Sequence, residues 1–230
     1  MLNCPQMEEK TTLPGKTFAI GDIHGCLQAL DAVLEAINPS EHDTVVTLGD
    51  YVDRGDDSRG VIDRLIELQK RCHLVPLRGN HEEMMVDVVI RGGPPHSWLR
   101  YGGVNTLDSY GFIGDMEVVP ESHREFLLGL RDWHETEQHF FVHANYEEDL
   151  PLAQQEPEIL RWTSLKDRMP GPHFSKKRAV VGHTAARDGE IFDVGYLICL
   201  DTFVYGGGWL TALDMQQGKI FQADRSGILR

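Results

Sequence analysis

Basic residues are scarce in this sequence. Lys and Arg number 22 against 36 Asp and Glu, so the formal net charge is −14 and the isoelectric point is near 5.1. Binding to nucleic-acid backbones or to anionic membranes requires clustered Lys and Arg. We therefore expect no nucleic-acid partner and no membrane partner, and any phosphate that the protein handles should meet a few local cations.

Cysteines are also few, and long hydrophobic runs are missing. Cys4, Cys26, Cys72 and Cys199 form neither a CxxC pair nor a dense framework, so we expect reduced thiols in a cytoplasmic protein. No apolar run approaches the roughly 20 residues that span a membrane. The first ten residues lack the basic and then apolar pattern of a signal peptide. A cytoplasmic location is therefore predicted.

The sequence does contain a repeated unit of strand, polar turn and helix. Apolar segments rich in β-branched residues at 17–20, 44–48 and 73–77 predict strands. Each is followed by a polar turn and then by apolar residues at helical spacing. Such units in succession imply parallel strands whose turns share one edge of a sheet.

The remaining segments complete an α/β domain. Residues 1–15 are polar and predict a flexible N-terminal arm, whereas residues 16–230 are predicted to form a single domain. Residues from about 92 to 134 are rich in Gly, Pro and aromatics and predict short helices that cover the cleft. Further strands are expected at 140–142 and 178–181, and the C-terminal strands are expected to be antiparallel. The expected fold class is α/β, with two packed mixed β-sheets flanked by helices.

Polar side chains follow the predicted strands at five points. Asp50 comes directly after the segment 44–48, and a carboxylate at the end of a buried strand is costly unless it is paired or binds a metal. The residues at these strand ends are Asp22, His24, Asp50, Asn80, His143 and His183. Their mixture of oxygen and imidazole ligands suits manganese, iron or zinc rather than calcium. With Asp50 central, the set predicts two ions about 4 Å apart that share its carboxylate and clamp a phosphoryl group.

Each of these residues also has an ordinary structural interpretation. An isolated Asp in a glycine-containing turn is more often a turn residue or a helix cap, and a lone His at a strand end is more often an ordinary polar residue. The recurrence of such residues at successive strand ends favours metal binding. The other histidines, at positions 42, 73, 96, 123, 134, 139 and 173, are expected at the surface or in loops. Trp98 and Tyr101 either line a substrate groove or pack within the helical cover.

Three motifs identify a family resemblance. Residues 21–25 (GDIHG), 49–55 (GDYVDRG) and 78–82 (RGNHE) occur in this order, and together they are far more specific than any one alone. They resemble the signature motifs of the phosphoprotein phosphatase family, whose fold is the calcineurin-like metallophosphoesterase sandwich. The resemblance covers residues 16–215. It is greatest to small bacterial and phage protein phosphatases and to symmetrical diadenosine tetraphosphatases; for the phage type it includes Trp98 followed by Gly102-Gly103.

The resemblance implies a role for each motif residue. Asp22 and His24 would hold one metal ion, Asn80, His143 and His183 the other, and Asp50 would bridge the two. His81 matches the general acid that protonates the leaving alkoxide, and Asp53 the carboxylate that orients it. Arg54 would bind the non-transferred phosphate oxygens. A second phosphate-binding arginine is assigned to Arg168, with Arg161 as the alternative.

The resemblance also implies the reaction. We expect a serine/threonine protein phosphatase that hydrolyses phosphomonoesters by direct attack of a hydroxide bridging two divalent ions. Manganese is the expected metal, with iron or zinc as alternatives. The expected substrate is a phosphoprotein or a phosphorylated small molecule. Two other functions stay open: a symmetrical bis(5'-nucleosyl)-tetraphosphatase, and an inactive module that binds phosphoproteins.

Overall fold

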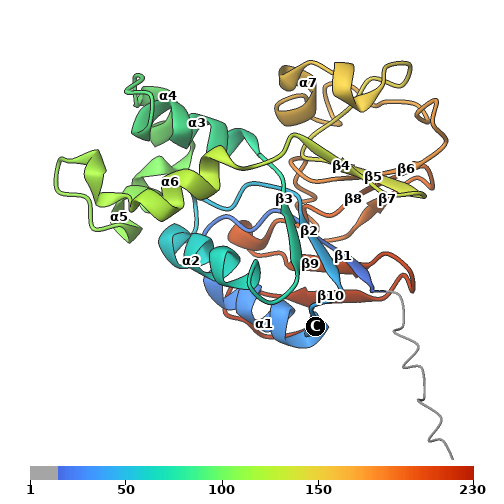
Figure 1. Ribbon diagram of the computed structural model, residues 1–230, viewed down its shortest axis with the longest axis horizontal. Coiled ribbons are helices and arrows are strands. Elements are labelled where there is room, and N and C mark those ends of the chain that lie inside the picture. The colour runs from blue at the N-terminus through green and yellow to red at the C-terminus, as the bar shows by residue number, and fades with distance from the viewer. Residues whose placement is uncertain (1–14) are drawn as a thin grey trace, which may run out of the picture.

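Two five-stranded mixed sheets lie at the centre of the computed structural model, which describes residues 15–230 (Figure 1). The strands are β1 Thr17–Ile20, β2 Thr44–Thr47, β3 His73–Pro76, β4 Trp133–Glu135, β5 His139–Val142, β6 Arg178–Val181, β7 Phe192–Asp193, β8 Leu197–Cys199, β9 Leu210–Asp214 and β10 Ile220–Ala223. The first sheet has the order β10-β9-β1-β2-β3 and the second β4-β5-β6-β8-β7. The predicted fold class, two packed mixed sheets flanked by helices, is confirmed.

Helices cover the outer faces of both sheets. They are α1 Leu27–Ile37, α2 Ser58–Leu68, α3 Asn80–Val89, α4 His96–Trp98, α5 Val104–Ser109, α6 Glu121–Leu128 and α7 Pro157–Arg161, with the short segments η1 Leu99–Gly103, η2 Met116–Val118, η3 Leu152–Gln154 and η4 Val204–Gly206. In Figure 1, α2 lies to the left of the first sheet, α1 lies below and to its left, and α7 lies above the second sheet. No helix within residues 15–230 is both long enough and apolar enough to cross a membrane.

The alternation of side chains along each strand assigns them to layers. In β1, Phe18 and Ile20 pack against the helices, while Ala19 points into the core between the sheets. In β5, Phe141 enters that same core from the other side, and Phe140 joins the layer beneath α7. Because side chains along a strand point alternately to opposite faces, each sheet contributes side chains to two hydrophobic layers. The result is an arrangement of helices, sheet, sheet and helices.

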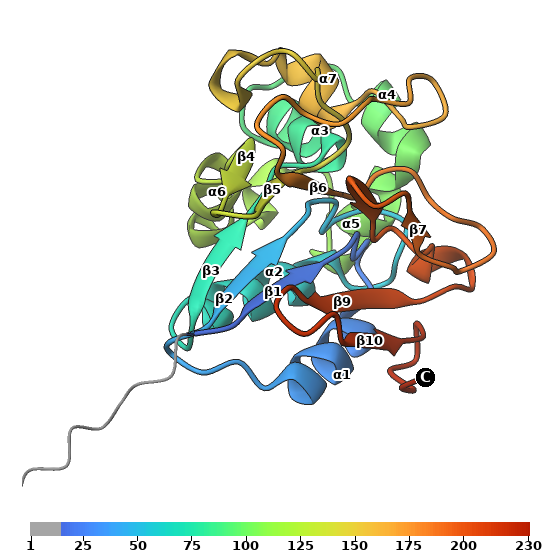
Figure 2. The same cartoon turned by 90° about the vertical axis from the view of Figure 1, so that its right-hand side faces the viewer.

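The pairing of the strands aligns the polar turns. β1, β2 and β3 are parallel and adjacent, with Thr17 opposite Thr44 and Thr44 opposite His73. In the second sheet β5, β6 and β8 are parallel. Figure 2 shows β3, β2 and β1 side by side. The carboxyl ends of these strands, which carry the motif residues, therefore lie along one edge of each sheet.

Some predicted details differ from the structure. β9 and β10 are antiparallel as expected, but β8, in the same C-terminal region, runs parallel to β6. β4 and β7 were not predicted because they are short and lack an apolar run. Residues 92–134 form α4, η1, α5, η2 and α6 and then enter β4. The predicted arm, 1–15, lies outside the described residues except for its last one, and the division into an arm and a single domain stays a prediction.

Candidate active site

The structure brings together the six residues predicted as metal ligands. Asp22 and His24 follow β1, Asp50 follows β2, Asn80 begins α3 after β3, His143 follows β5, and His183 follows β6. Backbone bonds join these turns: the amides of Ile23 and His24 donate to the carbonyl of Asp50 at 3.0 and 2.7 Å, and Gly182 donates to the carbonyl of His143 at 2.7 Å. The ligands thus come from both sheets, and their relative positions are set by the backbone.

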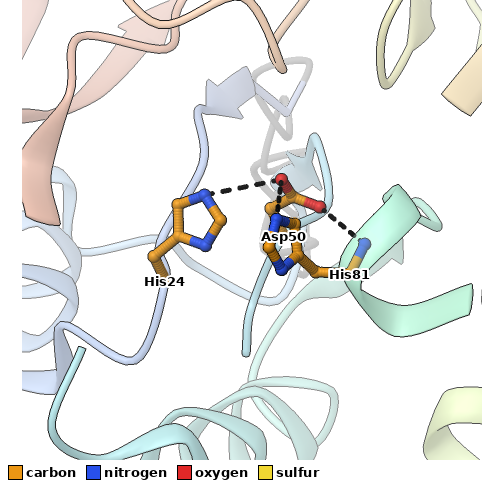
Figure 3. Close-up of side chains that lie close together, drawn as sticks. All are labelled: His24, Asp50 and His81. Atoms are coloured by element: carbon orange, nitrogen blue, oxygen red, sulfur yellow. Dashed lines mark hydrogen bonds and ion pairs between the residues drawn. The ribbon is translucent and has the colours of Figure 1, made fainter. Parts of the chain in front are cut away.

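Asp50 belongs to two groups of candidate ligand atoms. One contains His24, Asp50 and His81, and the other Asp50, His143 and His183; the atoms of each group lie within 4.8 Å of one another. Figure 3 shows the imidazoles of His24 and His81 directed at the carboxylate of Asp50. Their Nε2 atoms lie 3.4 and 3.9 Å from Oδ2 of Asp50, whereas Nε2 of His143 lies 3.4 Å from Oδ1. One carboxylate therefore serves both groups, one oxygen on each side.

In the second group, His143 and His183 direct lone pairs at the same point, and the side-chain oxygen of Asn80 joins them there. Nδ1 of His143 lies 2.7 Å from the carbonyl of Leu48, and Nε2 of His183 lies 3.0 Å from the carbonyl of Trp162. A carbonyl can only accept, so these two nitrogens carry the protons. The opposite nitrogens are then unprotonated, and they lie 3.2 Å from each other and 3.2 and 3.1 Å from Oδ1 of Asn80. Such a cluster of acceptors is repulsive without a cation, so this donor set fits a metal ion.

A lone pair is likewise directed at Asp50 from His24 of the first group, and Asp22 supplies a further carboxylate beside them. Nδ1 of His24 lies 3.0 Å from the carbonyl of Val52 and therefore donates, which leaves a lone pair on Nε2 beside Asp50. The backbone N–H of His183 donates to both oxygens of Asp22 at 3.1 and 3.0 Å, so Asp22 lies at the junction of the two sheets. Two carboxylates and an imidazole lone pair make a donor set that fits a second divalent ion.

Burial shifts the pKa values of these groups, and a bound cation would offset the cost of burying their carboxylates. Burial, together with the carboxylates of Asp201 and Asp50, raises the pKa of Asp22 well above its ordinary value. Burial also lowers the pKa of His24 and His143, and lowers that of His183 to about 4. These imidazoles are thus neutral at pH 7, the state in which they bind metals. Ionisation of Asp22 is unfavourable in this environment, and a bound cation would compensate the charge.

His81 differs from the other imidazoles of the site. Its Nδ1 lies 2.6 Å from Oδ2 of Asp53, and both residues are buried. Although burial acts to lower it, the carboxylates of Asp50 and Asp53 raise the pKa of His81 above its ordinary value. Since Asp53 accepts the proton on Nδ1, Nε2 faces Asp50 and the ligand groups. The site therefore contains one imidazole whose pKa is raised, beside three whose pKa is lowered.

Arg54 is the predicted phosphate-binding residue that reaches the ligand groups. Its Nη1 lies 3.0 Å from Nε2 of His24, and its guanidinium lies 4.5 Å from the centre of the Tyr205 ring. The Tyr205 ring in turn meets the His24 ring edge-on at 4.8 Å. A guanidinium over an aromatic face is held electrostatically, and the N–H groups that do not contact His24 can still bind an anion.

The two candidates for a second phosphate clamp are engaged elsewhere. The guanidinium of Arg168 donates to the carbonyl of Tyr146 at 3.0 Å and pairs with the carboxylate of Glu148. Arg161 pairs with Glu83 at 3.0 Å and with Asp132 at 2.5 Å. The role of Arg168 in phosphate binding stays a prediction, to which this geometry adds no support.

Backbone strain is concentrated at the site. Within the described chain, eight residues other than glycine have positive φ, and five of them are His24, Asp50, Asp53, Arg54 and His183. A left-handed conformation is costly for such residues and persists where the surrounding structure enforces it, as at functional sites.

Several site residues were not assigned by sequence reasoning. Asp201 follows β8, is buried, and faces Asp22; it could have been found as one more polar residue at a strand end. Glu82 accepts from the amides of Asp50 and Tyr51 at 2.8 and 2.7 Å. Trp98 and Thr106 bond to Asp53, so Trp98 packs inside the cover and does not line a groove.

The expectation that the remaining histidines lie at the surface or in loops is wrong for His123, which is buried in a helix; His173 lies in a loop as expected, although it is buried there. His123 of α6 is buried and lies 2.7 Å from the hydroxyl of Tyr110. His173 is also buried, and its Nε2 lies 2.9 Å from the carbonyl of Leu150. Both satisfy their ring nitrogens through local polar partners, which a search for helical or strand periodicity does not detect.

The chain is similar in sequence to known proteins. Serine/threonine-protein phosphatase 1 of Salmonella typhimurium is 26% identical over 211 residues, which cover 86% of this chain and 91% of that protein. The symmetrical bis(5'-nucleosyl)-tetraphosphatase of Pectobacterium carotovorum is 32% identical over 108 residues, 46% of this chain and 33% of that protein.

The fold is shared with solved structures. The structure of a protein serine/threonine phosphatase from Saccharomyces cerevisiae superposes with a TM-score of 0.64 at 16% identity, covering 96% of this chain and 80% of that chain. Residues 15–207 match the family described as calcineurin-like phosphoesterase. The chain therefore belongs to the calcineurin-like phosphoesterase family of metallophosphoesterases.

Proposed function

We propose that the protein is a phosphomonoesterase that uses two divalent metal ions and removes phosphate from phosphoserine or phosphothreonine in proteins. The observation that carries this proposal is the convergence of six candidate ligands next to the His81–Asp53 pair: Asp50 lies close to His24 on one side and to His143 and His183 on the other, Asp22 accepts from the amide of His183, and Asn80 lies beside both of those imidazoles. The Salmonella relative supports the protein substrate, because the similarity extends over 91% of its length.

The ligand assignment follows from the two groups. Asp22, His24 and Asp50 would hold one ion, and Asp50, Asn80, His143 and His183 the other, with manganese expected and iron or zinc as alternatives. Bound there, the ions would polarise the phosphoryl oxygens and lower the pKa of a coordinated water. His81 is left out of the ligand set because its Nδ1 bonds to Asp53, and because the carboxylates of Asp50 and Asp53 raise its pKa whereas burial lowers the pKa of the other three imidazoles.

The protein's own residues then handle the substrate. Arg54, held against Tyr205, binds the non-transferred phosphate oxygens through its free N–H groups. His81 keeps a proton on Nε2 while Asp53 accepts from Nδ1. As the phosphorus–oxygen bond to the serine or threonine breaks, His81 gives that proton to the leaving alkoxide. Such general acid catalysis typically contributes about 10²–10⁴-fold.

A second candidate is symmetrical hydrolysis of diadenosine tetraphosphate. It is favoured by tetraphosphatases that match part of the chain, such as the Pectobacterium enzyme at 32% identity over 108 residues. The leaving group would then be a nucleoside diphosphate instead of an alkoxide. That similarity covers a third of the Pectobacterium protein, so we rank this function second.

A paired turnover assay on one manganese-loaded sample tests the proposal. We expect a phosphothreonine peptide to be turned over with a higher kcat/KM than diadenosine tetraphosphate. Preference for the dinucleotide would overturn the protein-phosphatase assignment in favour of the second candidate. If neither substrate is hydrolysed while two equivalents of metal are bound, the chain is an inactive module that binds phosphoproteins.

A further inference from the structure

The carboxylate of Asp53 is held from two sides. On one side it accepts the Nδ1 proton of His81 at 2.6 Å. On the other side Oδ1 accepts from the hydroxyl of Thr106 at 2.6 Å and from Nε1 of Trp98 at 2.9 Å, and Trp98 also lies 3.1 Å from Oδ2. Trp98 and Thr106 belong to α4 and α5, which are part of the segment predicted to cover the site.

The backbone of Asp53 is held as well, by one residue of α5 and one of α2. Its amide lies 2.9 Å from Oγ1 of Thr106 and 3.0 Å from Oγ of Ser58, and these two hydroxyls lie 3.0 Å apart. Asp53 is in the left-handed region with φ 71°. A buried residue in this conformation needs such external bonds to stay there. Thr106 thus bonds to both the side chain and the main chain of Asp53.

Two glycines of η1 allow this segment to pack closely against the Asp53–Arg54 backbone and against Trp98. Gly102 of η1 has φ 117°, and a Cβ atom there would lie 2.7 Å from the backbone nitrogen of Arg54 and 3.2 Å from Cβ of Asp53. A Cβ at Gly103 would lie 2.6 Å from the indole of Trp98. The combination of Trp98, Gly102-Gly103 and Thr106 therefore forms one element, which we call the Asp53 support.

We propose that the Asp53 support is a positioning device for the acid: Trp98 and Thr106 fix the orientation of the Asp53 carboxylate and, through it, that of His81. This inference rests on the proposed function. A carboxylate has about four acceptor positions, and a single hydrogen bond to His81 leaves it free to rotate. Donors from the cover occupy the other oxygen, so Asp53 has one orientation in which His81 Nε2 faces the site.

A purely structural role would have a different pattern of contacts. A buried Trp or Thr that serves packing alone needs only one partner for its polar group. Here the indole N–H and the Thr106 hydroxyl are both directed at the one carboxylate that bonds His81, and the three residues Asp53, Trp98 and Thr106 are each fully buried. The contacts therefore converge on the acid pair.

The dependence of the rate on the leaving group tests this role. An alkyl phosphate such as a phosphoserine peptide needs a protonated leaving oxygen, whereas p-nitrophenyl phosphate leaves as a stable anion. For Thr106→Val, which removes the hydroxyl at similar volume, we expect kcat on the peptide to fall about tenfold more than kcat on the aryl ester, a part of the total acid contribution. Thr106→Ser restores the donor and should return the ratio of the two rates to that of the wild type.

Matched variants separate positioning from general damage. Ser109→Ala removes a hydroxyl from the same helix that bonds to the carbonyl of Thr106 at 2.7 Å and does not contact Asp53; its rate ratio should equal that of the wild type. If Thr106→Val does not fold, Trp98→Phe makes the same test by removing the indole N–H. An equal loss on both substrates, or no loss on either, would overturn the positioning role. A wild-type protein inactive on both substrates would instead contradict the proposed function.

Discussion

At the scale of single residues, Asp201 shows how metal binding and stability oppose each other. Burial raises its pKa from the ordinary 3.8 to about 6, and it contributes to the raised pKa of the neighbouring Asp22. Such carboxylates destabilise the metal-free fold, because each ionised form is less favourable there than in the unfolded chain. The same negative charge attracts cations into the site.

We predict that Asp201→Asn stabilises the metal-free protein. The folded pKa of about 6 lies above the unfolded value of 3.8, so ionisation of Asp201 costs free energy above pH 6, and this cost vanishes below about pH 4. The difference between these pKa values corresponds to roughly 3 kcal/mol. Asn can still accept from the amide of Phe203 as Asp201 does, at 3.1 Å.

Thermal unfolding in the presence of a chelator measures this effect. At pH 8 the variant should unfold at a higher temperature than the wild type, and the difference should shrink as the pH falls to 4. A constant difference across this range would mean that the charge of Asp201 is not its cause.

A second prediction at the scale of single residues concerns Asp53. The Asp53–His81 bond helps to raise the pKa of His81, and the acid must be protonated to act, so activity toward alkyl phosphates should fall as the pH rises through that pKa. Asp53→Asn removes the negative charge and lowers the pKa. We therefore expect the alkaline fall of kcat/KM to move to lower pH, with a loss of about 10²-fold or more at pH 7.

The pH profile of Asp57→Asn provides the control. Asp57 caps α2 by accepting from Gly60 at 2.7 Å, and Asn is an equally good cap. Its profile should match that of the wild type. An unshifted alkaline limb in Asp53→Asn would contradict the assignment of His81 as the acid.

At the scale of elements, η1 is the part of the cover that approaches the second motif. Gly102→Ala places a Cβ at a φ of 117° and 2.7 Å from the nitrogen of Arg54. Gly111→Ala is matched to it, because Gly111 also has positive φ, 70°, but has no atom within 4 Å of the added Cβ. We expect Gly111→Ala to cost about 1–2 kcal/mol of unfolding free energy through backbone strain.

Gly102→Ala should cost about 1–3 kcal/mol more than Gly111→Ala, because the added methyl overpacks a close backbone contact. It should also reduce turnover, since Arg54 and Asp53 must shift to make room. Denaturant unfolding and steady-state kinetics on both variants measure the two effects. If both variants lose stability equally and keep full turnover, η1 does not fix the positions of Asp53 and Arg54 in the second motif.

Much of this element structure could be predicted from the sequence. Strands β1 and β6 have the expected residues, because each is an apolar run followed directly by glycine. The candidate ligands could be predicted because parallel strands place their polar turns at one edge. The contact of Trp98 and Thr106 with Asp53 could not, since it joins residues 45 and 53 positions apart through a kinked segment without periodicity. The ion pairs of Arg161 and Arg168 likewise depend on side-chain geometry.

At the scale of the whole molecule, the candidate site exists only when both sheets are packed together. His143 and His183 follow strands of the second sheet, whereas Asp22, His24, Asp50 and Asn80 follow strands of the first. The apolar layer between the sheets, with Ala19 and Val46 on one side and Phe141 on the other, sets the distance between these two sets. Metal binding should therefore stabilise the packing of the sheets as well as the site.

We predict that the wild-type protein binds two equivalents of Mn²⁺ and that metal removal lowers its melting temperature. A ligand at 100 times its Kd stabilises the folded state by about 2.7 kcal/mol, which corresponds to roughly 5–10 °C for each ion in a chain of this size. Asp50→Asn should lose the stabilisation by both ions, because Asp50 belongs to both ligand groups. His183→Ala should retain one equivalent, since His183 belongs to one group.

Elemental analysis after gel filtration, combined with thermal unfolding with and without a chelator, distinguishes these cases. His42→Ala is the control, because the His42 side chain is 59% exposed and lies 3.9 Å from the exposed carboxylate of Glu41; it should bind two equivalents and lose as much stability on chelation as the wild type. A wild type with a single equivalent, or a His183→Ala variant that binds as much metal as the wild type, would contradict a centre in which one carboxylate is shared between two sites. Because the ligands come from both sheets, the loss of melting temperature on chelation should be larger in the wild type than in His183→Ala, and larger in His183→Ala than in Asp50→Asn.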